Sequence, residues 1–165
     1  MAAPAGRSAR PPWDPETNWH VTLAFYGEQP AGIVPELAEN LTEAARQTPR
    51  FELSLAGAGV FRHEVCWIGI SDARGALGPL AQLVRGSYAN ATQHTRNRFH
   101  VTVARPGRRS GLEDTMAALA VYRGPAWTVD KITLFQSDLG QGVGGHPLYT
   151  ALARADLAVM RHTDS

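Results

Sequence analysis

The sequence predicts an α+β protein, or one with a mixed α/β sheet, folded as two similar lobes around a single cleft. Three observations support this fold class. The chain has 165 residues and is 44% hydrophobic, which suits one globular domain with a real core. Segments with strand and helix periodicity are interspersed along its whole length. A short His-x-Thr motif occurs twice, at His20 and His100, each time followed by a predicted helix, and this faint repeat favours two related halves.

The first half of the chain is expected to hold three strands and one helix. The helix is predicted at residues 34–48, where apolar side chains recur at helical spacing. Pro35 lies in its first turn and Pro49 ends it. Strands are predicted where apolar side chains alternate with polar ones or run without interruption: residues 18–27, 50–55 and 65–70.

The second half is expected to hold two helices and three strands. One helix is predicted at residues 77–92. The other begins with the capping pattern Ser110-x-x-Glu113 and contains Met116 on its apolar face. The last two strands are expected to join across a glycine-rich stretch, and the three strands are residues 98–105, 127–136 and 146–153.

Composition limits the class of protein and its surroundings. Residues 1–12 are rich in Pro, Gly, Ala and Arg and are expected to be extended or disordered, residues 13–157 to form one bilobal domain, and residues 158–165 to form a tail. No run of about 20 apolar residues and no secretory signal is present, so we expect a cytoplasmic protein without a membrane partner. The single cysteine, Cys66, excludes an internal disulfide and is expected to be a buried small hydrophobe. The sequence implies no obligate protein partner.

The chemistry-bearing residues are the two motifs His20-Val21-Thr22-Leu23 and His100-Val101-Thr102-Val103. Side chains alternate between the two faces of a strand, so the histidine and the threonine of each motif share one face. The apolar residues of each motif occupy the other face, which is expected to be buried. Two such strands lying side by side would present two imidazoles and two hydroxyls to one pocket.

This set of groups suits phosphodiester cleavage without a metal. Histidine has a reference pKa of about 6.5, so near neutral pH one ring can act as a base and the other as an acid. Each role is typically worth about 10² to 10⁴ in rate. The hydroxyls of Thr22 and Thr102 can donate to phosphate oxygens, and Arg105, close after the second motif, can meet their charge. A zinc site would need a third ligand at suitable spacing, which neither motif has. No metal and no cofactor are therefore expected.

The other histidines and the aromatic residues are weaker candidates for a site than the two motifs. A single His-x-Thr in a strand occurs often by chance, whereas two on alternating strands favour a function. The remaining histidines, His63, His94, His146 and His162, are expected to be surface or loop residues. Most of the large aromatic side chains near the motifs are expected to belong to the core. Two of them, Phe25 and Phe61, are also candidate platforms for stacking a nucleobase.

At these motifs the sequence resembles the two-histidine phosphoesterases, and more narrowly the bacterial RNA 2′,3′-cyclic phosphodiesterases, historically called 2′-5′ RNA ligases (LigT-like). The segments Asn18–Glu28 and Phe99–Arg105 are similar to the two signatures of this family. The resemblance runs from about Pro11 to Leu157, and three shorter stretches add to it: residues 59–69, 132–138 and 149–152.

The resemblance implies a bilobal α+β fold with two pseudo-symmetric sheet-plus-helix lobes around a central cleft, without a metal. It implies hydrolysis of RNA 2′,3′-cyclic phosphate ends to 2′-phosphomonoesters, with RNA or a nucleotide carrying that end as the partner. By analogy His100 is the general base that activates water, His20 is the proton donor to the leaving oxygen, and Thr22 and Thr102 bind the phosphate. Two alternatives stay open: a module that binds nucleotides or RNA ends without turnover, and a reversible 2′-5′ RNA ligase.

One departure from the family pattern concerns the N-terminal side. Family members usually begin with a strand and a helix ahead of the first motif, whereas nineteen residues precede His20 here. We therefore expect this N-terminal strand and helix to be missing, either because the start is truncated or because one lobe has lost its outer elements. An unpaired sheet edge would result, and such edges favour pairing with another chain.

Overall fold

The computed structural model describes residues 13–62, 65–86, 88, 99–105 and 112–159. The predictions for residues 1–12 and 160–165, and the expected cap at Ser110, lie outside this part of the chain. The described part holds two antiparallel sheets, one with strand order β3-β2-β1-β4 and one made of β5 and β6. The helices and strands are α1 (Val34–Gln47), β1 (Phe51–Phe61), β2 (Val65–Ser71), α2 (Leu77–Arg85), β3 (His100–Ala104), α3 (Leu112–Ala118), β4 (Arg123–Val129), β5 (Lys131–Asp138) and β6 (Leu148–Asp156). The α+β prediction is confirmed.

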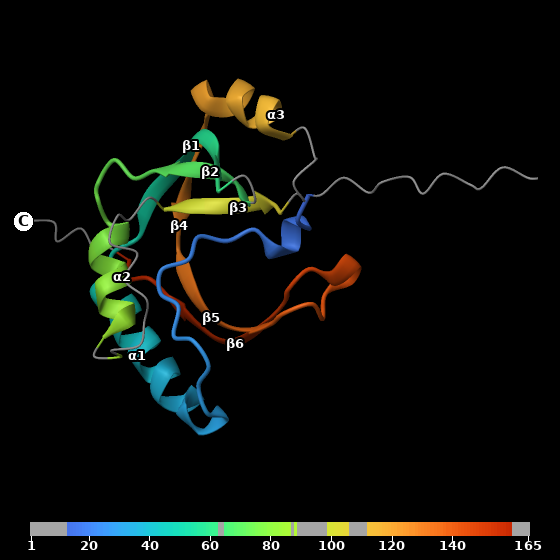
Figure 1. Cartoon of the computed structure of the whole chain (residues 1–165). Helices are drawn as coiled ribbons and strands as arrows, with labels where there is room; N and C mark the ends of the chain where they lie inside the picture. Colours follow the sequence, from blue (N-terminus) through green and yellow to red (C-terminus); the bar gives the residue numbers. More distant parts are fainter. Residues whose placement is uncertain (1–12, 63–64, 87, 89–98, 106–111, 160–165) are drawn as a thin grey trace, which may run out of the picture.

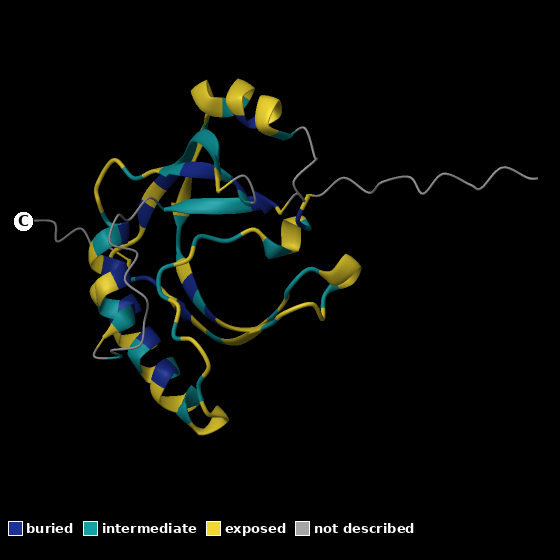
Figure 2. Cartoon of the chain, in the orientation of Figure 1, coloured by how far each residue is buried: buried dark blue, intermediate teal, exposed yellow. Residues whose placement is uncertain are grey.

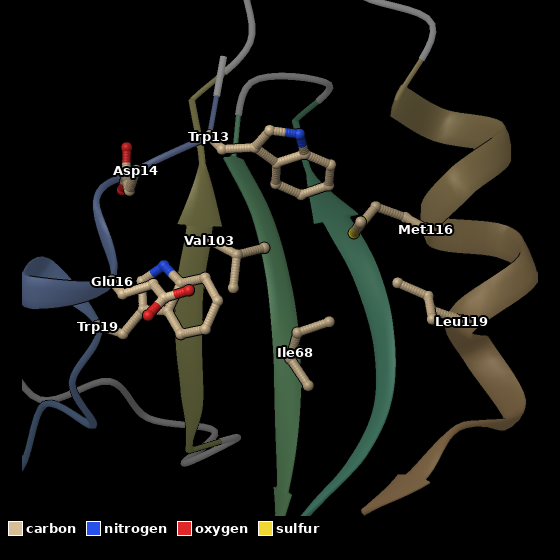
Figure 3. Close-up of a pocket in the computed structure, with 8 residues that line it drawn as sticks. All are labelled: Trp13, Asp14, Glu16, Trp19, Ile68, Val103, Met116 and Leu119. Atoms are coloured by element: carbon tan, nitrogen blue, oxygen red, sulfur yellow. The ribbon is translucent and has the colours of Figure 1, made fainter. Parts of the chain in front are cut away.

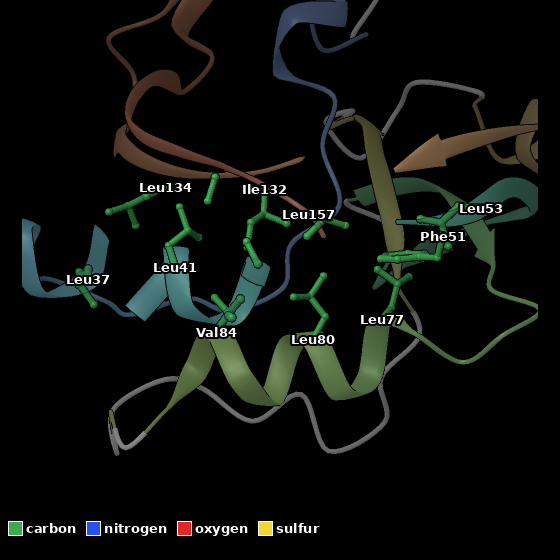
Figure 4. Packing of buried hydrophobic residues seen from close by; sticks show 13 residues of the cluster. Leu37, Leu41, Phe51, Leu53, Leu77, Leu80, Val84, Ile132, Leu134 and Leu157 are labelled. Atoms are coloured by element: carbon green, nitrogen blue, oxygen red, sulfur yellow. The ribbon is translucent and has the colours of Figure 1, made fainter. Parts of the chain in front are cut away.

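The first lobe consists of the β5–β6 hairpin with helices α1 and α2 packed beside it (Figure 1). Its core is an apolar cluster to which both helices, the start of β1 and the β5–β6 hairpin all contribute (Figure 4). Leu80 on α2 is completely buried there, and Leu41 on α1 is 3% exposed. The apolar spacing read from the sequence thus faces the hairpin, and the polar faces of both helices lie outward (Figure 2).

The second lobe consists of the four-stranded sheet with α3 on one of its faces (Figure 1). A separate apolar cluster fills the space between this helix and the strands, centred on Met116 and Cys66, which are 1% and 0% exposed. Burial raises the pKa of the Cys66 thiol, and the Glu113 carboxylate raises it further. Cys66 is therefore a buried small hydrophobe, as the sequence predicted, and its thiolate is disfavoured.

The segment that carries the first motif is not the continuous strand that the alternation predicted. Glu16–Asn18 forms a single 3₁₀ turn, and pairing in residues 18–27 is limited to one antiparallel bridge between Val21 and Val101. The segment runs between β3 and the β5–β6 hairpin (Figure 1), so it meets both lobes. Leu23, Ala24 and Tyr26 all pack against the first core, so residues from both faces of the predicted alternation contribute to it.

Two boundaries also differ from the sequence prediction. The single strand expected over residues 127–136 is two strands in different sheets, β4 and β5, separated at Asp130, whose carbonyl accepts a hydrogen bond from the Leu157 amide. Helix α2 ends at Arg85 rather than near residue 92. Gly86 follows with a positive φ of 54°, and its amide donates to the Gln82 carbonyl, which closes the helix.

Several aromatic side chains expected in the core are exposed instead. Trp19, Phe25 and Phe61 are 45%, 57% and 38% exposed, whereas Trp67 and Tyr26 are half-buried. The alternation did not show that these rings would remain open to solvent.

Candidate active site

The two His-x-Thr motifs lie side by side. The antiparallel bridge between Val21 and Val101 joins the central residues of the two motifs. In an antiparallel arrangement, the residues on either side of such a bridge face each other in opposite order, so His20 lies toward Thr102 and Thr22 toward His100. Within β3, side-chain alternation puts His100 and Thr102 on the face opposite to Val101. The pairing of the motifs expected from the sequence is present in the fold.

β3 positions the second motif at the edge of the four-stranded sheet. His100 is opposite Gly69, and Thr102 is opposite Trp67, both on β2. A Cβ atom at Gly69 would lie only 2.4 Å from the carbonyl oxygen of Ala56. β2 thus requires glycine at this position and places no side chain opposite the imidazole.

Aromatic rings from the β1–β2 hairpin surround His100. The Phe61 ring meets the imidazole edge-on with ring centroids 5.2 Å apart, and the Trp67 ring lies 6.4 Å away. Phe61 and Trp67 stack on each other at 5.1 Å. Gly59 makes this possible, because a Cβ there would come within 2.5 Å of the Trp67 ring. Phe61, a stacking candidate from the sequence, is therefore next to the second histidine.

His20 is enclosed by different elements. Its ring lies 4.8 Å from that of Tyr149 on β6, at an angle of 64° between the planes, and Tyr149 in turn contacts Phe135 on β5. His20 Nδ1 is 2.7 Å from the carbonyl oxygen of Asn18. A carbonyl only accepts hydrogen bonds, so Nδ1 must carry a proton and Nε2 is the nitrogen left for chemistry. Each motif histidine is thus flanked by an aromatic pair from a β-hairpin.

Arg105 is held by a buried carboxylate. Its guanidinium Nη1 donates to Asp14 Oδ2 over 2.9 Å, and the Asp14 side chain is only 4% exposed while that of Arg105 is 46% exposed. His146 Nδ1 lies 2.9 Å from the other carboxylate oxygen of Asp14, which makes an ion pair when the imidazole is protonated. His146 is half-buried and lies in the loop before β6.

The remaining predicted site residues are near the motifs in sequence and accessible. Thr22 is exposed, Thr102 is half-exposed, and Phe25 follows the first motif with an exposed ring. Within the described residues, no group of three or more His, Cys, Asp or Glu side chains has an arrangement that could hold a metal ion. None of the helices in that part of the chain is long and apolar enough to cross a membrane.

A hollow on the opposite face of the four-stranded sheet is distinct from the motif face. It lies between α3 and the N-terminal segment, and Figure 3 shows Val103 and Ile68 beneath it and Met116 and Leu119 beside it. Its walls are mostly apolar, and neither motif histidine lines it. It therefore offers little to an anionic phosphate, and the polar site is the face that carries His20 and His100.

Sequence reasoning missed four residues that build this site: Asp14, Asn18, His146 and Tyr149. Asn18 and Tyr149 lie inside segments quoted for the family resemblance, but nothing in their spacing indicated that they would meet at His20. Asp14 precedes the first motif by only six positions, and a lone acidic residue next to Pro15 carries no recognisable signal. Only the fold brings Asp14 and His146 together.

The chain is similar in sequence to known proteins. The model of the 2′-5′ RNA ligase superfamily matches residues 3–141. A protein of Aquifex aeolicus named RNA 2′,3′-cyclic phosphodiesterase is 30% identical over 150 residues, which cover 85% of this chain and 78% of the relative. One of the same name from Geobacillus stearothermophilus is 27% identical over 152 residues, which cover 84% of this chain and 48% of the relative. The chain thus spans about half the length of that relative.

Solved structures extend the comparison to the fold. The structure of TT0787 from Thermus thermophilus matches with a TM-score of 0.70 and 25% identity over 94% of this chain and 87% of that one. The structure of LigT from E. coli complexed with 3′-AMP matches with a TM-score of 0.65 and 28% identity over 86% and 78%.

Two curled sheets with few helices, joined where two His-x-Thr motifs meet, define the two-histidine phosphoesterase fold. Within that class the chain belongs to the 2′-5′ RNA ligase superfamily.

Proposed function

We propose that this protein hydrolyses RNA 2′,3′-cyclic phosphate ends to 2′-phosphomonoesters, using His20 and His100 as an acid–base pair without a metal. The observation that carries the proposal is the bridge between Val21 and Val101, which sets the two motifs side by side. The names of the relatives from Aquifex aeolicus and Geobacillus stearothermophilus support the substrate and the reaction. A nucleotide or an RNA end carrying the cyclic phosphate is the proposed partner.

In the proposed reaction, His100 takes a proton from a water molecule as its oxygen forms a bond to phosphorus. The bond between phosphorus and the 3′ oxygen breaks, and protonated His20 donates its Nε2 proton to that oxygen. The product carries a 2′-phosphate and a free 3′ hydroxyl. Proton exchange with solvent then restores neutral His100 and charged His20. Because the Asn18 carbonyl already accepts from Nδ1, the charged form of His20 is hydrogen-bonded and its Nε2 proton points away from that contact.

The threonines and the aromatic rings bind the substrate in this proposal. Thr22 and Thr102 donate to the non-bridging phosphate oxygens and hold the phosphorus between the rings. Phe61 and the exposed Phe25 are proposed to stack on nucleobases. Arg105 contributes positive charge near the phosphate while Asp14 holds its guanidinium.

The reverse reaction is a second candidate, favoured by the name of the superfamily, 2′-5′ RNA ligase. The same residues would serve, with the acid and base roles exchanged, because the two directions share one transition state. Joining of RNA halves through a 2′-5′ bond would identify it, whereas binding of nucleotides without any turnover would identify a binding module.

Removal of metal ions is expected to leave the activity intact. Turnover of 2′,3′-cyclic AMP should continue at the same rate after dialysis against EDTA, because both proton transfers are assigned to side chains. The measurement is the initial rate before and after treatment, with added Mg²⁺, Mn²⁺ or Zn²⁺ as the control. Loss of activity in EDTA that a metal restores would contradict the metal-free scheme.

Replacing Thr22 or Thr102 by valine, which has nearly the same shape but no hydroxyl, is expected to lower the catalytic efficiency. A hydrogen bond to a charged group is worth about 1.5 to 3 kcal/mol, so Thr22→Val and Thr102→Val should each lower kcat/KM by roughly 10-fold to 100-fold. Thr42→Val on α1 removes a hydroxyl that donates to the Ala38 carbonyl of the same helix, and it serves as the matched control. Equal kcat/KM values for all three variants would exclude phosphate binding by the motif threonines.

A further inference from the structure

We propose that Asn18 is a positioning residue for His20: its side chain anchors the first-motif segment to the β5–β6 hairpin so that its own carbonyl holds the imidazole in the Nδ1–H tautomer. The inference rests on the proposed function, because it concerns how one of the two acting rings is oriented. It starts from two hydrogen bonds that converge on this residue.

The backbone carbonyl of Asn18 contacts the His20 ring. Asn18 is the last residue of the 3₁₀ turn Glu16–Asn18, and carbonyls at the end of a helical turn have no partner within the turn. Here the ring of His20, two residues later, donates its Nδ1 proton to that oxygen over 2.7 Å. In free neutral histidine both tautomers exist, so a fixed acceptor is what selects one of them.

The side chain of Asn18 bonds to a distant part of the chain. Asn18 Nδ2 donates to the carbonyl of Pro147 over 2.9 Å, across 129 residues of sequence. Pro147 lies immediately before β6, which begins at Leu148 and carries Tyr149 against the His20 ring. The Asn18 side chain thus connects the segment that precedes His20 to the residue that precedes β6.

The residue before Pro147 contacts a buried carboxylate. The preceding residue, His146, lies 2.9 Å from the buried Asp14 carboxylate, which also accepts from Arg105 at the end of the second motif. The backbone amide of Asp14 donates to the Val103 carbonyl on β3 over 2.8 Å. When His146 is protonated, its ion pair with Asp14 therefore connects the residue before Pro147 to the strand that carries His100.

These contacts have a consequence for the reaction. With Nδ1–H engaged, a proton can leave or join His20 only at Nε2, the nitrogen that faces away from the Asn18 carbonyl. If the Asn18 side chain is lost, the turn is free to shift, and a displacement of about 1 Å at a reacting group can cost about 10²-fold in rate. The Asn18 side chain would act on kcat rather than on substrate affinity, because it is assigned no contact with the substrate.

The test uses the full chain and two variants of the same kind. Asn18→Ala removes the bond to Pro147, and Asn40→Ala removes an equivalent bond from an asparagine amide to the Val84 carbonyl, 44 residues away in sequence and within the first core. Asn18→Asp keeps the size of the side chain and loses the donor. We expect kcat for 2′,3′-cyclic AMP to fall by roughly 10-fold to 100-fold in both Asn18 variants, with KM changed less than 3-fold. Asn40→Ala should keep the wild-type kcat.

A spectroscopic readout separates positioning from activity. In protein with ¹⁵N-labelled imidazoles, measured at a pH above the titration of its histidines, the two ring nitrogens report the tautomer directly. The His20 signals are identified by their absence in His20→Ala. Wild type and Asn40→Ala should show a protonated Nδ1, and Asn18→Ala should show a mixture with protonated Nε2.

A positioning role for Asn18 requires both a lower kcat and a mixture of His20 tautomers in Asn18→Ala. An unchanged tautomer in Asn18→Ala, or an unchanged kcat, overturns it. Failure of the proposed function has a different signature: a wild-type protein without turnover, in which the tautomer still depends on Asn18.

Discussion

His20→Ala and His100→Ala are each expected to lower kcat/KM for 2′,3′-cyclic AMP by at least 10² to 10⁴, the range typical of one general acid or base. The physical reason is that each proton transfer has a single assigned donor or acceptor. The measurement is steady-state kinetics at several pH values. Because the two rings act on one phosphorus, the double variant should lose little more than the weaker single variant.

The pH dependence distinguishes the two roles. A base must be unprotonated and an acid protonated, so the wild-type kcat/KM should fall on both sides of an optimum. The residual activity of His100→Ala should lose the fall at low pH, and that of His20→Ala should lose the fall at high pH. The opposite pattern would exchange the assignments. A single variant with wild-type turnover would exclude the acid–base pair, and circular dichroism would show that the variants are folded.

Of the variants proposed for this protein, Leu80→Ala is expected to lower the free energy of unfolding most. Leu80 is completely buried on α2 at the centre of the first core, and replacing a buried leucine by alanine typically costs about 2 to 5 kcal/mol. The same cluster packs against Leu23 and Tyr26, which follow the first motif. Urea unfolding monitored by fluorescence measures the change in the free energy of unfolding.

Leu139→Ala is the matched control, since Leu139 is 79% exposed beyond the end of β5. Its effect should stay within about 0.5 kcal/mol. If Leu80→Ala destabilises the protein no more than Leu139→Ala does, the first core is not packed as described. Well below its unfolding temperature Leu80→Ala should remain active, because it removes no group from the site.

The fold class and the pairing of the motifs could be predicted from the sequence. The bridge between Val21 and Val101 joins the two motifs, and helical spacing correctly located α1. Such patterns report which side of an element is apolar, and they are local. They do not report where a strand changes sheets, so the passage from β4 to β5 at Asp130 was missed.

The supporting residues of the site could not be predicted in the same way. Asp14 and His146 are separated by most of the chain, and their contact depends on where the β5–β6 hairpin folds back. The Asn18 side chain reaches Pro147 for the same reason. Alternation also assumed that an apolar residue in a strand is buried, whereas Trp19 and Phe25 line a segment that pairs at only one bridge and remains open.

A crystal structure of the protein with the product 2′-AMP measures most directly whether two histidines serve one phosphorus. The account predicts that the phosphate lies between the rings, with a nitrogen of His20 and a nitrogen of His100 each about 3 Å from a phosphate oxygen or the 3′ hydroxyl. A phosphate bound by only one of these rings, or bound elsewhere on the protein, would contradict it.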